Sequence, residues 1–256
     1  MRPLSQVLAR GLAATGLGLC AWEGAIGLFG IPTYIVPHVW SVGESLYKHW
    51  TYLSRHCLVT LGESTCGAAI GIMGGILVGA SLANSRIARW LAEPYLVAFQ
   101  SFPREALAPL LVVWFGFGVI PKIVMASLIC FFPMALAALS AFLKTPRELC
   151  DLLWAQGATP WQLFIFVRVP NAVPSLVGGA KVALPLAVIG AVIGEFIGGS
   201  QGLGYIVATS AGQSDTPLLF SALVLLGVIG LSTLALIRTL EHLVRRRFFG
   251  HLQDFN

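Results

Sequence analysis

The feature of this sequence that most limits its fold is a series of six apolar segments joined by short polar connections. We place the segments at about residues 7–29, 58–83, 105–117, 119–143, 173–197 and 217–240. A helix needs about 20 apolar residues to cross the hydrocarbon core of a bilayer, and five of the six segments reach that length. The third is shorter, so we expect residues 88–102 to form an interfacial helix, broken at Pro103, that leads into it.

The composition agrees with a membrane location. Of the 256 residues, 57% are hydrophobic and only 11% are charged, whereas a soluble domain carries about 25% charged residues. So few charged side chains could not solvate the surface of a soluble protein of this size. We therefore predict an all-α, polytopic membrane bundle of about six transmembrane helices. Residues 1–256 form a single domain, with the first span at 7–29 and the core spans at about 58–240.

Lysines and arginines are distributed unevenly between the two sides of the expected bundle. With the N-terminus in the cytoplasm, the inner connections carry ten of them and the outer connections carry three, one of which is Lys122. Because Lys and Arg accumulate in short cytoplasmic loops, this excess predicts that both termini are cytoplasmic. It also explains the net charge of +5 without nucleic-acid binding, which we do not expect. The five cysteines show no paired or metal-ligand spacing and receive no function.

The connection between the fourth and fifth segments, residues 144–171, contains signals for two helices. Residues 145–148 (TPRE) and 159–162 (TPWQ) each combine a hydroxyl N-cap, a proline at the first helical position, and a Glu or Gln three residues after the cap. This combination is a capping box, and it predicts that a helix begins at each proline. Gly157 supplies the left-handed residue that ends the first helix, and we expect the second to end at Pro170.

This connection is longer and more ordered than the joining of two spans requires, since a handful of polar residues would suffice. Its expected helices are amphipathic, with the apolar residues Leu149, Leu152, Leu153, Trp154, Trp161, Leu163 and Phe164. We therefore predict a cytoplasmic docking surface for a partner protein, and a helix pair lying on lipid is the alternative. A DNA-reading helix-turn-helix is disfavoured because the segment has few Lys and Arg side chains for phosphate contacts.

The spacing within this connection resembles the EAA signature of ABC importer permeases. That signature is Glu-Ala-Ala, three residues, Gly, nine residues, and a short apolar stretch that ends in Pro. Here Gly157 is followed by nine residues and then by Val-Arg-Val-Pro at 167–170. Asp151, Leu152 and Leu153 occupy the Glu-Ala-Ala positions, so the chain departs from the signature where the alanine pair has become a leucine pair.

Two further stretches are similar to the nitrate, sulfonate and taurine branch of that family. One is residues 60–63 (TLGE) with the regularly spaced glycines that follow, and the other runs from FPREALAPL at 102–110 through WFGFG at 114–118. The whole resemblance covers about residues 36–247. It implies the fold of a type I ABC importer permease.

The resemblance also implies a function and a set of partners. The chain would be the permease subunit of an ATP-driven importer in a bacterial inner membrane. It would form the path for a small, anionic solute such as a sulfonate, taurine, nitrate, or a related organic anion or vitamin precursor. The implied partners are a second permease copy in a homodimer, two cytoplasmic ABC ATPase subunits, a periplasmic or lipid-anchored substrate-binding protein, and the lipid bilayer. The residues expected to couple to the ATPase are Asp151, Leu152, Leu153, Ala155, Gly157, Ala158, Thr159, Pro160, Trp161 and Pro170.

The chain itself has no phosphate-binding loop of the form Gly-x-x-x-x-Gly-Lys-Ser/Thr, so ATP and Mg would be bound by the partner ATPase. We expect no catalytic residues, no metal and no cofactor in this chain. Its histidines lie in connections or tails at no ligand spacing, and no nucleophile is paired with a base. The function that remains as an alternative is a secondary transporter or channel subunit that works without an ATPase.

Ionisable residues inside the apolar segments are costly, by about 2.5–3.5 kcal/mol at a helix centre, and so require a reason. The candidates for a translocation pathway or gate are Arg104, Glu105, Lys181, Glu195 and Glu63. Arg104 and Lys181 would favour an anionic solute. The alternatives are an ion pair that only fixes packing for Arg104 with Glu105, snorkelling for Lys181, and positions among the headgroups for the other two.

The second segment carries glycines at four-residue spacing, which places them on one helix face where another helix can approach closely. They are Gly67, Gly71, Gly75 and Gly79. We predict that this face packs within the chain. A face that slides against a moving helix is the alternative.

Overall fold

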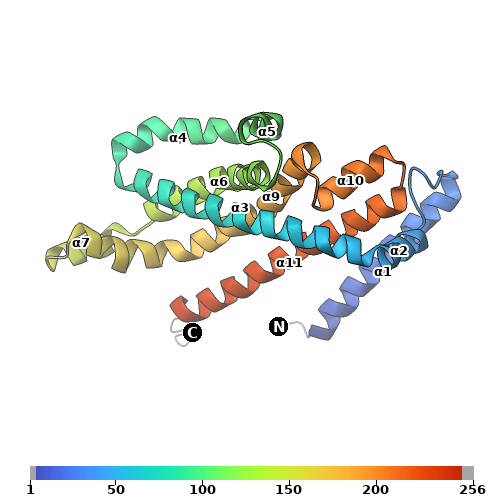
Figure 1. Ribbon diagram of the computed structural model, residues 1–256. Helices are drawn as coiled ribbons and strands as arrows, with labels where there is room; N and C mark the ends of the chain where they lie inside the picture. Colours follow the sequence, from blue (N-terminus) through green and yellow to red (C-terminus); the bar gives the residue numbers. More distant parts are fainter. Residues whose placement is uncertain (1–3, 250–256) are drawn as a thin grey trace.

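The computed structural model describes residues 4–249, and the regular structure of this part of the chain is entirely helical (Figure 1). In chain order the elements are α1 (Leu4–Phe29), α2 (Val39–Lys48), α3 (Trp50–Asn84), α4 (Arg86–Ser101), η1 (Arg104–Leu107), α5 (Ala108–Phe115), α6 (Val119–Leu143), α7 (Arg147–Ala155), α8 (Pro160–Leu163), η2 (Phe164–Arg168), α9 (Val169–Gly198), α10 (Leu203–Gly212) and α11 (Thr216–Phe249).

The centre of the bundle is formed by α3, α6 and α9, which pack side by side along most of their length. In Figure 1, α4 and α5 lie along one side of these three helices and α11 lies along the other. The helices α7 and α8 lie at one end of the bundle, while α2 and α10 lie at the opposite end. We refer to these as the α7–α8 end and the α2–α10 end.

Small residues allow the three central helices to approach closely. A Cβ atom added to Gly71 of α3 would lie 2.5 Å from the backbone oxygen of Ser127 in α6. A Cβ added to Gly190 of α9 would lie 2.6 Å from the Cα atom of Ala126, also in α6. The other predicted glycines of α3 also lie against α6. Helices bring their backbones this close only where side chains are small, and this is the usual packing of helices in membranes.

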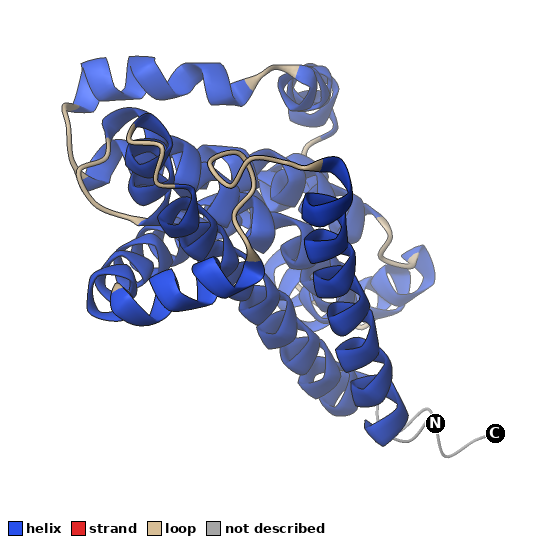
Figure 2. Cartoon of the chain, turned by 90° about the vertical axis from the view of Figure 1, so that its right-hand side faces the viewer, coloured by secondary structure: helices blue, strands red, loops and turns tan. Residues whose placement is uncertain are grey.

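Four described helices are long and apolar enough to cross a membrane: Trp50–Asn84, Val119–Leu143, Pro160–Gly198 and Thr216–His242. The pair Arg86–Ser101 and Arg104–Phe115 gives a fifth crossing if it is counted as one broken span, and its two parts meet at 88°. Figure 1 shows α5 end-on and Figure 2 shows it lengthwise, so α5 runs across the direction of α4. The break lies at the predicted place, Pro103. The first predicted segment is helical, and it is apolar over Ala13–Phe29.

The second span begins earlier than the sequence suggested. The sequence placed its start at about residue 58, but α3 already starts at Trp50, shortly after the helix α2. Leu53 is fully buried and packs with Leu203 of α10 and Ala222 of α11. These contacts with distant parts of the chain extend α3 by about two turns beyond its apolar stretch.

The expected helix end at Pro170 is wrong, because α8, η2 and α9 form one continuous helix from Pro160 to Gly198. A proline has no N–H to donate to the carbonyl four residues earlier, and it therefore usually ends or bends a helix. Here the turn before Pro170 is the π-helical η2, which shifts the backbone pairing by one residue. In addition, Asn171 Nδ2 donates to the carbonyl of Val167 over 2.8 Å.

Candidate coupling surface and buried polar network

The turn between α7 and α8 is built around Gly157, whose φ of +79° lies in the left-handed region that glycine adopts without strain. The N–H of Gly157 donates to the carbonyl of Trp154 and the N–H of Ala158 donates to the carbonyl of Leu153, both over 3.0 Å. This pair of bonds is a Schellman motif, which closes the end of α7. No atom lies within 4 Å of the place where a Cβ would stand on Gly157, so only the backbone angle calls for glycine.

Of the two predicted capping boxes, the second is present and the first is wrong. Thr159 Oγ1 accepts from the N–H of Gln162, and Gln162 Oε1 accepts from the N–H of Thr159 over 2.8 Å. Thr145 makes no such bond, since its hydroxyl donates to the carbonyl of Phe142 in the last turn of α6. The helix α7 therefore begins one residue later than predicted, at Arg147, without a side-chain cap.

The segment that contains α7, the Gly157 turn and α8, residues 147–163, is here called the docking corner. In Figure 1, α7 projects from the α7–α8 end of the bundle, and its main contacts are with α8. None of the residues of α7 is buried. Leu152, Trp154 and Trp161 are 54%, 51% and 68% exposed, which leaves a row of large apolar side chains without cover in this chain.

The residues predicted to couple to an ATPase thus lie on or next to one projecting surface. Leu153, Ala158 and Pro170 are half-buried and the others are exposed: Asp151, Leu152, Ala155, Gly157, Thr159, Pro160 and Trp161. Pro170 lies at the start of α9, behind the corner.

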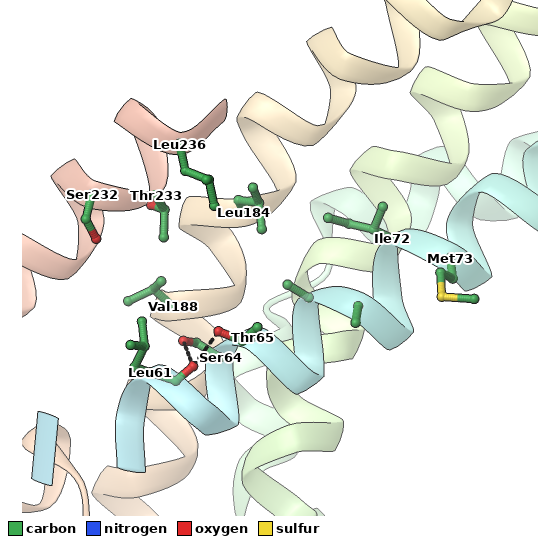
Figure 3. Close-up of a pocket in the computed structure, with 12 residues that line it drawn as sticks. Leu61, Ser64, Thr65, Ile72, Met73, Leu184, Val188, Ser232, Thr233 and Leu236 are labelled. Atoms are coloured by element: carbon green, nitrogen blue, oxygen red, sulfur yellow. Dashed lines mark hydrogen bonds between the residues drawn. The ribbon is translucent and has the colours of Figure 1, made fainter. Parts of the chain in front are cut away.

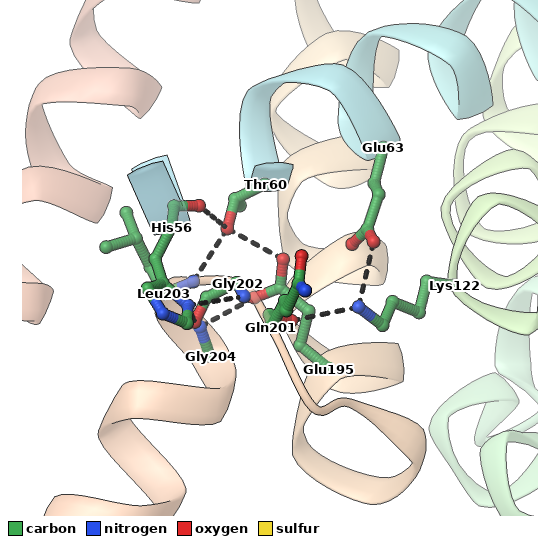
Figure 4. A network of polar contacts seen from close by, with 9 residues as sticks. All are labelled: His56, Thr60, Glu63, Lys122, Glu195, Gln201, Gly202, Leu203 and Gly204. Carbon is green, nitrogen blue, oxygen red and sulfur yellow. Dashed lines mark hydrogen bonds and ion pairs between the residues drawn. The ribbon is translucent and has the colours of Figure 1, made fainter. Parts of the chain in front are cut away.

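A second cluster of polar residues lies buried towards the α2–α10 end, where α3, α6, α9 and α10 meet (Figure 4). Glu195 of α9 is 1% exposed. Its Oε1 accepts a hydrogen bond from Thr60 Oγ1 over 2.7 Å, and its Oε2 accepts one from the N–H of Gly204 over 2.6 Å. The Thr60 hydroxyl also accepts from the N–H of Leu203 over 2.8 Å. Glu195 and Thr60 therefore hold the first turn of α10.

The connection between α9 and α10 fits closely around the Glu195 carboxylate. A Cβ on Gly204 would lie 2.8 Å from Glu195 Oε2, and one on Gly202 would lie 2.6 Å from the same atom. Gly202 also has a φ of +112°, which other residues rarely adopt. Its N–H donates to His56 Nδ1 over 2.9 Å. These glycines are required here both for space and for backbone shape.

Lys122 and Glu63 form a buried ion pair beside this connection. Both side chains are 3% exposed, and Lys122 Nζ lies 2.8 Å from Glu63 Oε1. The same ammonium group donates to the backbone carbonyl of Gln201 over 2.9 Å. We use the term outer network for the residues drawn in Figure 4, namely His56, Thr60, Glu63, Lys122, Glu195, Gln201, Gly202, Leu203 and Gly204.

The structure brings Glu63 and Glu195 together, but it separates them from the other predicted pathway residues. Lys181 forms an ion pair with Glu241 of α11 in which both side chains are about one third exposed. Arg104 is half-buried at the break between α4 and α5, and Glu105 beside it is exposed. Sequence reasoning had treated Lys122 as a loop residue, and it missed Thr60 and His56. The position of Lys122 directly before the largely apolar stretch 123–143 was a sign that it could need a buried partner.

Arg104 has a specific partner in α6. Its Nη1 donates to the carbonyl of Ile129 over 2.9 Å. The residue four positions after Ile129 is Pro133, inside α6, which has no N–H to offer that carbonyl. The guanidinium group therefore supplies the donor that the helix lacks. Arg104 Nε is buried without a partner.

A groove of about 580 Å³ runs along α3, α9 and α11 (Figure 3). Most of its lining is aliphatic, and its four hydroxyl side chains are Ser64, Thr65, Ser232 and Thr233. Each of these hydroxyls donates to a backbone carbonyl three or four residues earlier in its own helix. The groove is thus an apolar surface in this chain.

Taken together, the membrane-spanning helices and the exposed docking corner define an integral membrane subunit with a surface available to a partner. Residues 71–248 match the family described as the binding-protein-dependent transport system inner membrane component. The chain belongs to this family, and it is the permease subunit of an ABC importer, in which ATP hydrolysis resides in a partner subunit.

Comparison with individual proteins agrees. The chain is 37% identical over 233 residues to the riboflavin transport system permease protein RibX of Chloroflexus aurantiacus, covering 89% of this chain and 86% of RibX. It is 34% identical over 224 residues to the formylaminopyrimidine transport permease protein ThiX of Halalkalibacterium halodurans, covering 87% of this chain and 89% of ThiX. A chain of the MetNI methionine ABC transporter, solved in an inward-facing conformation, superposes with a TM-score of 0.67 at 25% identity, covering 77% of this chain and 98% of that one.

Proposed function

We propose that this permease receives the force of ATP hydrolysis through its docking corner, which inserts into a cytoplasmic ABC ATPase subunit. The observation that carries the proposal is the exposure of α7, an amphipathic helix with no buried residue that stands away from the bundle. An exposed row of large apolar side chains is typical of a protein interaction site. In this arrangement the α7–α8 end and both termini are cytoplasmic, as the distribution of Lys and Arg predicts.

The complete importer, in this proposal, contains two copies of the permease, two ATPase subunits and a substrate-binding protein. Residues 1–256 act as one permease domain, and the α2–α10 end faces the binding protein across the bacterial inner membrane. The family description, which makes transport dependent on a binding protein, supports that last partner.

The transported solute, we infer, is a small organic molecule of the vitamin-precursor or organic-anion class. Two relatives that align over most of their length are named for riboflavin and formylaminopyrimidine, both nitrogen heterocycles. Of the predicted pathway residues, Glu105 is exposed at the break between α4 and α5 with Arg104 beside it. Lys181, Glu63 and Glu195 are paired within the chain, so we assign the pathway role to the break.

Replacement of Gly157 by valine tests the docking role. A β-branched residue forced into the left-handed region costs about 1–2 kcal/mol, so the turn at the tip of the corner should open. If that strain falls on docking, the affinity for the ATPase drops about tenfold. The measurements are co-purification of the ATPase subunit with the permease and ATP-driven uptake in reconstituted vesicles.

Gly30 offers a matched control. It also has a positive φ, of +60°, and no atom lies within 4 Å of its Cβ position, but it lies between α1 and α2 at the other end of the bundle. Gly30→Val should therefore impose similar strain while leaving ATPase binding intact. If Gly157→Val and Gly30→Val retained the ATPase and supported uptake equally, the docking corner would not be the coupling element.

A further inference from the structure

The outer network contains more negative than positive charge. Its ionisable members on the packed helices are His56 and Glu63 from α3, Lys122 from α6 and Glu195 from α9, while α10 contributes only backbone N–H groups and Tyr205, which stacks on His56. His56 Nδ1 accepts from the N–H of Gly202 over 2.9 Å and also lies 3.2 Å from the carbonyl oxygen of that residue. Because these partners are neutral backbone groups, we count the imidazole as neutral. One ammonium group therefore faces two carboxylates. An uncompensated charge in such a buried place is strongly unfavourable.

The two carboxyl groups also contact each other. Glu63 and Glu195 lie within hydrogen-bonding reach of one another. Glu63 Oε1 accepts from Lys122, but Glu63 Oε2 is buried and has no partner. Both oxygens of Glu195 already accept hydrogen bonds from other groups. Two ionised carboxylates in contact would repel each other, and one oxygen would remain without a donor.

A single proton resolves both problems. Placed between Glu63 Oε2 and Glu195, it supplies the missing donor and brings the charge of the cluster to zero. A metal cation does not fit as well, because the groups that face these oxygens are donors: the Thr60 hydroxyl, the Gly204 N–H and the Lys122 ammonium group. Cations such as Na⁺ or Ca²⁺ need a shell of acceptor oxygens.

We propose that Glu63 and Glu195 form a proton-binding site in which the two carboxyl groups share one proton. The proton comes from water and returns to water. Glu195 and Lys122 hold the connection between α9 and α10, through Gly204 and Gln201. Occupancy of the proton site thus determines whether this connection stays fixed to α3 and α6. Loss of the proton makes the two carboxylates repel and releases the connection at the α2–α10 end.

Replacement of Glu63 by glutamine tests the site. The amide oxygen can accept from Lys122 Nζ as Glu63 Oε1 does, and the amide NH₂ group can donate to Glu195 where the proton stood. Glu63→Gln therefore imitates the proton-bound state but cannot release the proton. The control is Glu44→Gln, since Glu44 is exposed on α2 and pairs only with Lys48.

Infrared spectroscopy of the purified permease in lipid nanodiscs gives the direct readout. At neutral pH the wild type and Glu44→Gln should show the carbonyl band of a protonated carboxylic acid, which shifts in D₂O and disappears at alkaline pH. Glu63→Gln should lack this band. Thermal stability of the wild type should fall as the band disappears at rising pH, because the native network binds a proton that the unfolded chain has released. Over the same pH range Glu63→Gln should lose less thermal stability than the wild type.

The absence of the band from the wild type would overturn the proposal, and so would its persistence in Glu63→Gln. A stability that depends on sodium in the wild type but not in Glu63→Gln would also overturn it, in favour of a cation site. The wild-type spectrum and its pH dependence test the proposal even if the variant does not fold. None of these measurements needs the ATPase, so their outcome is independent of the docking corner.

Discussion

Replacing Gly71 by alanine tests the close contact between α3 and α6. The added Cβ would lie 2.5 Å from the backbone oxygen of Ser127, whereas ordinary contacts begin at 3.4 Å, so the two helices must separate by about 0.9 Å. The Cβ would also meet the Cys130 side chain. Rotation of that side chain cannot relieve the overlap with the Ser127 oxygen, because this oxygen belongs to the backbone. Overpacking of this kind costs about 1–3 kcal/mol.

The neighbouring Gly74 on the same helix separates this cost from the general effect of alanine. Alanine is favoured over glycine in a helix by about 1 kcal/mol at either position. A Cβ on Gly74 would lie 3.5 Å from the Phe131 ring, which is an ordinary contact. The difference between Gly71→Ala and Gly74→Ala therefore isolates the clash with α6, at about 1–3 kcal/mol.

The assay is thermal unfolding of each purified variant in the same detergent. For a chain of this size about 1 kcal/mol shifts Tm by about 2–4 °C, so Gly71→Ala should melt about 2–12 °C below Gly74→Ala. Equal melting temperatures, or a lower value for Gly74→Ala, would show that α3 and α6 do not meet along the glycine face.

Two further predictions concern hydrogen bonds described above. Arg104→Gln leaves the carbonyl of Ile129 without its donor, which should cost about 1–3 kcal/mol and lower both Tm and uptake; adding Pro133→Ala restores a backbone N–H in α6 and should recover Tm but not uptake, because the proposed pathway role of the break needs the Arg104 charge. Recovery of uptake together with Tm would limit Arg104 to helix packing. Thr159→Ala removes the N-cap of α8 and should cost about 0.5–2 kcal/mol, seen as faster hydrogen exchange in α8; Thr145→Ala, which removes no cap, should leave exchange in α7 unchanged. Similar changes in the two threonine variants would contradict the assigned caps.

The sequence was sufficient to predict those parts of the structure that depend only on residues close together in the chain. Gly157 and Thr159 act on atoms within a few residues, so the turn and the second capping box could be predicted. Thr145 carries the same signature, yet its hydroxyl binds the last turn of α6 instead. A capping pattern does not reveal that a preceding helix competes for the same group.

The outer network could not be predicted because its bonds join distant parts of the chain. Lys122 and Glu63 are 59 residues apart, and Thr60 and Glu195 are 135 residues apart. Rules for charges near membranes assign a lysine at the start of a span to the surface, which is correct on average. A buried acidic partner on another helix overrides that rule, and no pattern within one segment reports it. The helix end predicted at Pro170 was wrong for a related reason, because the π-turn that accommodates this proline has no simple sequence signature.

The unbroken helix from Pro160 to Gly198 gives the two ends of the molecule a mechanical relation. It contains 39 residues and so spans about 58 Å. Its first turn belongs to the docking corner, and its last turns carry Glu195. A tilt imposed on one end of such a lever displaces the other end without a chain of side-chain rearrangements between them. The π-turn η2 and the internal prolines Pro174 and Pro185 interrupt the regular backbone pairing of this lever, so it bends most easily at these places and stays stiff between them.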